Sequence, residues 1–444
     1  MTMNSNVPTA RQRVEIALLV LTLSSLATGS VFGQLDYDRP PILYSTAEVH
    51  DPVARLQTRL DRGEAKLEFD GPGGYLKSLL KELAVPESSQ MLVFSKTSFQ
   101  QRLISPRTPR ALYFNDDVYV GFVQNGDVLE LSSMDPQQGA IFYTLRQDDD
   151  GSPRFVRDRG NCLTCHASSR TQEVPGHVVR SVYPSLSGLP HFGSGTFRTN
   201  HTSPLSQRWG GWYVTGTHGK QRHMGNVVSR DRDRPEILDV EAGANRATLE
   251  DLFDTDPYLT GHSDIVALMV LEHQTEMHNR ITHAGFSARI ALQQSASMNE
   301  ILERPADYLS ESTERRLDNA AEKVVGYLLF QEEAELTDPI RGTSGFAEEF
   351  AARGPFDRQG RSLRQFDLRR RLFKHPCSYL IYSAEFDALP PPIKDRVHRR
   401  LWEVLTGQDS SDEFAHLAAS DRRAILEILR DTKKELPEYW RSDT

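Results

Sequence analysis

Residues 112–146 read LYFNDDVYVGFVQNGDVLELSSMDPQQGAIFYTLR, and apolar and polar side chains alternate along much of this stretch. Alternation with a period of two residues is typical of β-strands that bury one face. Asn125-Gly126 lies between two alternating segments and favours a tight hairpin turn. The stretch therefore predicts a small antiparallel sheet. We expect its strands at Met91–Phe94, Leu112–Phe114, Val118–Gln124, Val128–Ser132 and Ile141–Arg146.

Helical patterns lie on both sides of this predicted sheet. Two short amphipathic helices are expected before it, at Asp51–Ala65 and Gly73–Leu83. Residues 174–226 are rich in Gly, Pro and aromatic side chains without a sustained period, which predicts loops and short strands. Helical periodicity then returns in Ser263–His283, Glu314–Leu336, Leu363–Phe373, Pro391–Leu405 and Asp412–Leu429. The predicted fold class is α+β, with an α-helical C-terminal half.

The N-terminus has the pattern of a secretory signal peptide. Arg11 and Arg13 precede the apolar run Ile16–Leu26, and small residues follow as far as Gly33. We expect cleavage after Gly33 and a periplasmic or otherwise extracytoplasmic protein. The alternative is an uncleaved membrane anchor over residues 16–32, although several Thr and Ser side chains interrupt that run. No later stretch approaches about 20 apolar residues, so no stable membrane span is expected after cleavage.

The remaining residues suffice for two or three domains at about 150 residues each. We expect one domain over residues 34–229 and a helical domain over residues 230–444, which begins with the charged connector Arg230–Ala247. Lys and Arg number 52 against 61 Asp and Glu, a net charge of −9. This balance does not suggest a nucleic-acid partner but is compatible with a basic partner protein.

The chain has three cysteines, so disulfides are not expected to hold this fold together. Two of them form Cys162-Leu163-Thr164-Cys165-His166, which fits the C-x-x-C-H signal for c-type haem. Two thiols must add across two vinyl groups on one porphyrin edge while the adjacent imidazole binds iron. One helical turn places all three groups, so a short helix is expected. Three Cys and 14 His in 444 residues would give such a match about 0.0006 times by chance.

The cysteine pair allows two other interpretations. A redox dithiol is usually found in a βαβ unit, which this sequence does not predict. A structural zinc site normally recruits a second close pair of Cys or His ligands. Export favours haem, because c-type haem is attached outside the cytoplasm. The third cysteine, Cys377, is expected to be a small buried apolar residue without a chemical role.

The five-residue segment resembles the haem-binding motif of c-type cytochromes, and the chain as a whole resembles large exported bacterial proteins with a cytochrome c domain. The resemblance implies one covalent haem c, with Cys162 and Cys165 in the thioethers and His166 as the proximal iron ligand. We then expect residues 34–229 to form the haem-bearing domain and the helical domain over residues 230–444 to pack over the haem. The basic partner protein is expected to be a redox partner. Small electron-carrying cytochromes are helical, whereas strands precede the motif here. The resemblance thus supports haem attachment rather than a particular cytochrome fold.

Residues after the motif offer partners for such a haem. Arg198 and Arg208 are candidates for the propionates, and Trp209 and Trp212 for aromatic walls. The alternative is an ordinary aromatic packing cluster with solvated arginines. The sixth iron ligand is expected to be either Met224, in a loop rich in Gly, or His273, on the apolar face of a predicted helix. A histidine on such a face is more often a core residue.

Three functions are compatible with a haem bound at this motif. Single-electron transfer by a six-coordinate haem is the leading one. The second is a haem enzyme, peroxidase-like or another oxidoreductase, with an open distal side and the polar cluster His218, Arg222 and His223 in its pocket. The third is a haem sensor or interaction protein without catalytic activity, whose helical half binds another protein.

Overall fold

The computed structural model describes residues 36–149, 152–409 and 411–441. The expected signal peptide, residues 1–33, lies outside the described residues. Residues Tyr37–Thr444 form one compact unit. Within the described ranges, no helix is both long enough and apolar enough to cross a membrane.

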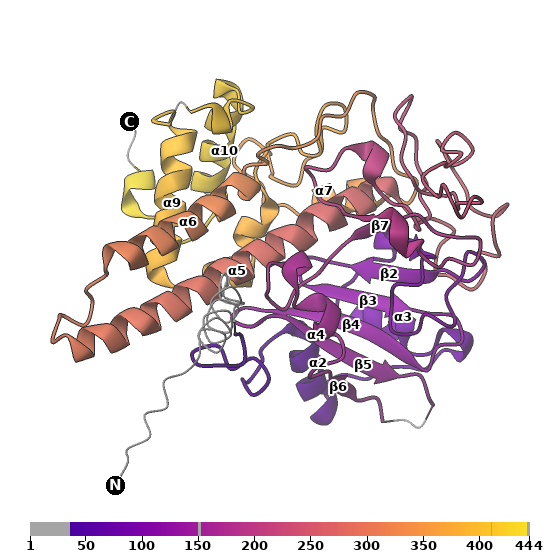
Figure 1. Cartoon of the computed structure of the whole chain (residues 1–444), viewed down its shortest axis with the longest axis horizontal. Coiled ribbons are helices and arrows are strands. Elements are labelled where there is room, and N and C mark those ends of the chain that lie inside the picture. The colour runs from indigo at the N-terminus through magenta and orange to yellow at the C-terminus, as the bar shows by residue number, and fades with distance from the viewer. Residues whose placement is uncertain (1–35, 150–151, 410, 442–444) are drawn as a thin grey trace, which may run out of the picture. The chain divides into compact units, whose positions relative to one another are not determined.

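The predicted antiparallel sheet is confirmed (Figure 1). Its strands pair in chain order, each with the next, so that the sheet is a simple meander. Asn125 has a φ of 56°, as a tight turn with Asn-Gly requires, and joins the third strand to the fourth. The strands are β1 Met91–Val93, β2 Arg110–Phe114, β3 Val118–Phe122, β4 Val128–Asp135, β5 Gly139–Arg146 and β6 Phe155–Arg157.

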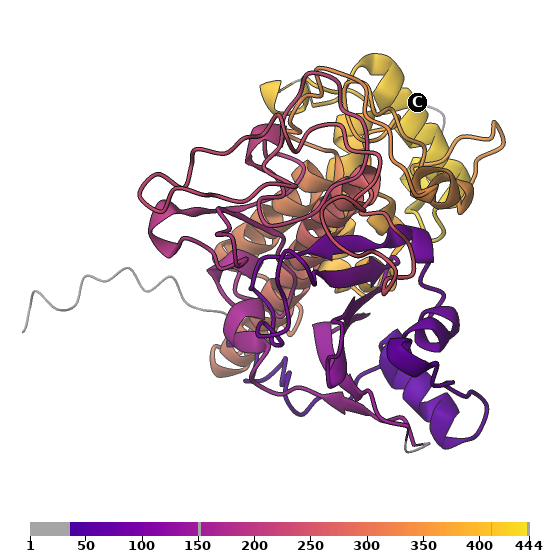
Figure 2. The ribbon, with the colours of Figure 1, turned by 90° about the vertical axis from the view of Figure 1, so that its right-hand side faces the viewer.

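The two faces of the sheet carry different parts of the chain. The Tyr143 hydroxyl donates to the carboxylate of Asp51 at 2.6 Å, and Asp51 caps helix α2, Pro52–Asp61. Figure 2 shows α2 and α3, Leu76–Glu82, on this side of the strands. The next side chain toward the N-terminus, Phe142, packs instead on His166, with ring centroids 4.9 Å apart. Because successive strand residues face opposite ways, the motif lies on the face away from α2 and α3.

The long helix α5, Ile265–Ile301, packs on the motif's side of the sheet. Gln274 of α5 donates to the Tyr119 hydroxyl of β3 at 2.7 Å. A single cluster of buried apolar side chains includes Phe114 from the sheet and Leu268 from α5. The core is therefore continuous across the domain boundary that was expected between residues 229 and 230.

The helical C-terminal half is confirmed. Helices α6, Glu311–Leu328, and α9, Pro391–Leu405, pack on α5, and α10, Ala419–Thr432, packs on α9. The irregular middle segment contains the two-stranded ribbon of β7, Arg180–Val182, and β8, Thr196–Arg198. The other helices are α4 Leu163–His166, α7 Phe346–Ala352 and α8 Ala384–Asp387.

The prediction of a helix over Leu363–Phe373 is wrong, because this segment is not helical. The Asp367 carboxylate accepts hydrogen bonds from the backbone N–H groups of Arg369 and Arg370, each at 2.9 Å, which is a local alternative to helical bonding. Leu368 has a φ of 56°, which no α-helix accommodates. The apolar residues at helical spacing here belong to a folded-back loop that packs its rings into the core.

Several predicted helix boundaries also need correction. The segment Ser263–His283 continues as α5 to Ile301, whereas Glu314–Leu336 stops as α6 at Leu328. Phe330, just beyond α6, has a φ of 58° that ends the helix. The predicted helix Asp412–Leu429 is divided into a short 3-10 turn and α10.

Asp264 fixes the start of α5 and provides a test of the fold. Its buried carboxylate accepts from Val266 N at 2.7 Å, and its second oxygen accepts from the backbone of Thr343 and Ser344 at 2.6 and 2.8 Å. We predict that Asp264→Ala lowers the free energy of unfolding by about 3 kcal/mol, because a cap is lost and buried donors lose their acceptor. Urea denaturation measures this. The exposed Asp307→Ala is the control, and equal stability of the two variants would contradict the assignment.

Candidate functional site

The C-x-x-C-H motif forms a single helical turn, as predicted. The backbone N–H groups of Cys165 and His166 both donate to the Cys162 carbonyl, at 3.1 and 3.0 Å. The helix α4 lies in front of the sheet in Figure 1. Cys162 is half-buried, Cys165 is exposed, and neither is in a disulfide. Both sulfurs are therefore available for bonding on one side of the turn.

His166 is held in one orientation. Its Nδ1 lies 2.9 Å from the carbonyl oxygen of Gly176. A carbonyl only accepts, so Nδ1 carries the ring proton and Nε2 keeps its lone pair. Burial lowers the pKa of His166 and favours the neutral ring. A neutral imidazole with Nδ1–H bound to a backbone carbonyl is the usual form of a metal-binding histidine.

The segment that supplies this carbonyl is itself fixed to α5. Asn279 accepts from His177 N at 2.9 Å and donates to His177 O at 2.7 Å. The Asn279 side chain lies so close to Gly176 that a Cβ at position 176 would collide with it. The His177 ring in turn contacts Ser132 of β4, with Nε2 2.7 Å from the hydroxyl oxygen. Helix, loop and sheet thus jointly position the acceptor for His166.

The Cys162 thiol does not resemble a reactive redox thiol. Burial and the nearby Asp158 carboxylate raise its pKa to about 12. Asp158 accepts from the backbone N–H groups of Gly160 and Cys162, at 3.0 and 2.9 Å. Nucleophilic thiols in proteins have lowered pKa values instead. The environment of Cys162 therefore favours a bonded or protonated sulfur over a dithiol catalyst.

A structural zinc site at the motif would require further ligands near the cysteine pair. Among the residues that the structure describes, no three or more His, Cys, Asp and Glu side chains are grouped so that they could share a metal ion.

An ion pair on the sheet borders the motif. Arg110 of β2 and Glu130 of β4 lie 2.8 Å apart and cross over Gly121 of β3, where a Cβ would collide with the guanidinium. The charges of Arg110 and Glu130 act in opposite directions on the pKa values of both Cys162 and His166, so the pair lies close to both. Gly121 leaves this part of the sheet without a side chain. Only the strand register, which brings residues 112, 121 and 130 side by side, reveals this arrangement.

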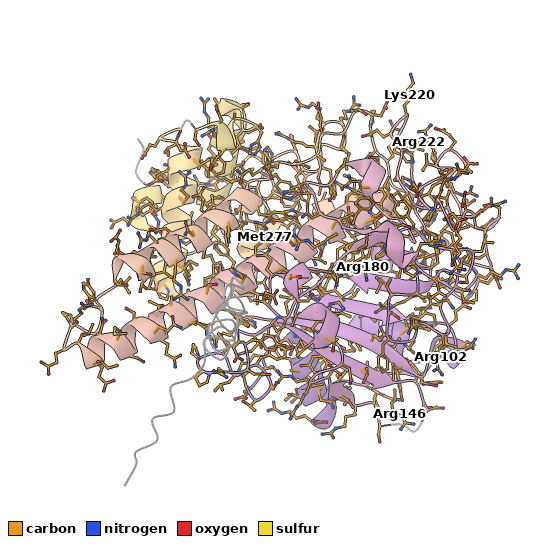
Figure 3. The ribbon with its side chains drawn as sticks, viewed as in Figure 1. Arg102, Arg146, Arg180, Lys220, Arg222 and Met277 are labelled. Atoms are coloured by element: carbon orange, nitrogen blue, oxygen red, sulfur yellow. The ribbon has the colours of Figure 1, made fainter. Side chains whose placement is uncertain are left out.

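Three arginines gather near Cys165. Arg180 and Arg198 are directly opposite each other in the β7–β8 ribbon, and Arg198 donates to the Arg170 carbonyl at 2.9 Å. Burial and the Arg170 charge lower the pKa of Arg180, whereas Cys165 opposes that shift. Figure 3 shows Arg180 projecting from the ribbon. Sequence reasoning selected Arg198 but missed Arg170 and Arg180. Arg170 could have been found by its place just after the motif, whereas Arg180 depends on strand pairing.

The other predicted haem contacts are divided between two places. Trp212 donates from Nε1 to the Arg180 carbonyl at 2.8 Å and so adjoins the arginines. Arg208 is buried and pairs with Glu272 of α5 at 3.0 Å, and Trp209 is fully buried in the core. Arg208 and Trp209 therefore join their loop to α5.

The two predicted sixth ligands have partners of their own. The Met224 sulfur lies 3.6 Å from the Ser181 hydroxyl, and Ser181 projects from β7 on the face opposite to Arg180. His273 is fully buried, with Nδ1 2.9 Å from Nδ1 of His201 and Nε2 2.7 Å from the Ser378 hydroxyl. These contacts do not bring either residue to His166. The sixth ligand stays a prediction.

The polar cluster expected in an enzyme pocket is tied to its own loop. His218 uses both ring nitrogens, at 2.7 Å from Gln221 O and 3.0 Å from Asn245 N. Arg222 pairs with Glu241 at 2.7 Å and lies with Lys220 in the loops at the top of Figure 3. His223 is buried and accepts from Gly225 N at 3.0 Å. These contacts stabilise the loop 218–225.

Comparisons with protein-family models, curated proteins and solved structures gave no match.

The Asp158 carboxylate next to Cys162 allows a direct test in protein made without haem. Asp158→Asn should lower the pKa of Cys162, because a negative charge that disfavours the thiolate is removed. Alkylation of Cys162 at pH 9 should then be several-fold faster than in the parent protein, followed by peptide mass spectrometry. Cys165 in the same molecule is the internal control. An unchanged rate at Cys162 would show that Asp158 does not set its pKa.

Proposed function

We propose that this protein is a c-type cytochrome that binds one haem covalently through Cys162 and Cys165, with His166 as the proximal iron ligand. The observation that carries the proposal is the His166 ring, whose Nδ1 lies 2.9 Å from a backbone carbonyl directly after a C-x-x-C turn. That contact leaves Nε2 to face a metal.

The surroundings of the motif fit the rest of a haem. Arg170, Arg180 and Arg198 would place positive charge beside the bound haem. Phe142, packed on the His166 ring, keeps that ring from rotating and shields it from water.

The bound haem supplies reversible single-electron oxidation and reduction of its iron. The chain's own residues would set how readily this occurs, through the His166–Gly176 hydrogen bond, the burial of the imidazole and the nearby arginine charges. We infer that the protein exchanges electrons with a redox partner protein outside the cytoplasm. The N-terminal export pattern supports that location.

The experiment is haem retention in acid acetone after the full chain is exported from cells that attach c-type haem. The parent protein should keep its haem colour in the precipitate, because thioether bonds survive denaturation. The double variant Cys162→Ala with Cys165→Ala should lose it. Cys377→Ala is the matched control and should behave as the parent, because Cys377 is buried away from the motif.

His166→Ala tests the ligand separately from the attachment. It should retain part of the covalent haem but change the visible spectrum, since the proximal imidazole is lost. Covalent haem in the double cysteine variant would refute the attachment site. An unaltered spectrum in His166→Ala would assign the proximal role to another residue.

A further inference from the structure

Two segments of the chain contain no acidic residue. Residues 88–115 and 174–230 are 28 and 57 residues long, and together they carry ten Lys and Arg but neither Asp nor Glu. At the chain's average of 61 acidic residues in 444, about 12 would be expected in segments of this length. The net charge of −9 therefore conceals a local excess of positive charge.

The structure brings the two segments together through two loops. The backbone N–H of Lys96 donates to the carbonyl of Gly188 at 2.9 Å. Gly188 also lies beside Pro106, which a Cβ at position 188 would contact at 3.4 Å. The β1–β2 loop, residues 94–109, and the β7–β8 loop, residues 183–195, are therefore side by side, and we call them the paired loops.

Positive charge on the paired loops is not neutralised by carboxylates. Within the described residues, three of the ten cations form ion pairs, namely Arg110, Arg208 and Arg222. Lys96, Arg102 and Arg107 of the β1–β2 loop are not among them, and Arg102 and Arg107 are exposed. Figure 3 shows Arg102 at the right-hand edge of the molecule. Such a cluster of cations attracts a negatively charged surface.

Large apolar side chains are exposed on the same two loops. Leu186 and Leu189 flank Gly188 and are 67% and 47% exposed, and Phe99 and Leu103 are 71% and 40% exposed. Gathered apolar side chains at a protein surface mark a contact site. Cations mixed with exposed apolar side chains bind an anionic lipid surface, because the cations contact phosphates while the apolar groups enter the acyl boundary.

We propose that the paired loops dock this protein on the surface of a membrane that contains anionic lipids, without spanning it. An acidic protein would also be attracted by the positive charge. A stable protein interface, however, needs a contiguous contact area of about 800 Å² per partner, whereas the apolar side chains here are divided between two loops. A lipid surface accepts separate side chains without a matching shape. The proposal does not rest on the proposed haem.

Co-sedimentation of the mature full chain with two kinds of vesicle tests the proposal. The protein should bind vesicles of equal parts phosphatidylglycerol and phosphatidylcholine, and high salt should weaken the binding by screening exposed charges. It should bind pure phosphatidylcholine vesicles far more weakly. The triple variant Lys96→Gln, Arg102→Gln and Arg107→Gln should bind the anionic vesicles about a hundredfold more weakly.

A second triple variant, Arg62→Gln, Lys66→Gln and Lys77→Gln, is the matched control. These three cations are exposed and lie in or beside α2 and α3, outside the paired loops. The control has the same net charge as the first variant but keeps the docking surface. It should therefore bind the anionic vesicles as the parent protein does.

Leu186→Ser with Leu189→Ser separates insertion of apolar groups from attraction by charge alone. Both side chains are exposed, so the variant should fold, and its affinity for the anionic vesicles should fall about tenfold or more. Undiminished binding of this variant would overturn the proposal and favour an acidic protein as the partner. No binding to the anionic vesicles, equal binding to both kinds of vesicle, or equal losses in the two triple variants would also overturn it. Sedimentation does not depend on haem, so the result is separable from that of the acid-acetone experiment.

Discussion

The pairing of Asn279 with the backbone of His177 is the contact on which the candidate site depends. One amide side chain on α5 uses its oxygen and its nitrogen, at 2.9 and 2.7 Å, to fix the segment that follows the motif. That segment presents the Gly176 carbonyl to His166. Without the long helix, the imidazole would lose its acceptor and its orientation. The helical half therefore contributes to the site as well as to stability.

The sheet provides the second constraint. Its meander places Phe142 and Ser132 on the motif's face, and Tyr143 on the opposite face with Asp51. A one-residue change of register would reverse every one of these contacts. The Arg110–Glu130 pair over Gly121 depends on the same register. The side chains that surround the motif are thus positioned by strand pairing as well as by α5, although the strands and α5 are more than a hundred residues apart in the sequence.

The sequence predicted features that follow from local patterns. The alternation around Asn125-Gly126 gave the sheet, and the spacing Cys162, Cys165 and His166 gave a helical turn. It could not distinguish Leu363–Phe373 from a helix, because Asp367 caps a turn there at apolar spacing typical of helices. It selected Arg208 and Trp209 for their residue types, but only tertiary structure shows that they pack on α5. Arg180 and Gly176 were missed because their roles arise from pairing with distant segments.

The central claim is that the motif is a haem attachment site, and the mass of one peptide tests it most directly. Trypsin should release residues 160–170, GNCLTCHASSR, from the exported native protein. The account predicts that this peptide carries the mass of one haem and absorbs visible light, with neither cysteine open to alkylation. Recovery of the colourless peptide with two free thiols, or with a disulfide between Cys162 and Cys165, would contradict it.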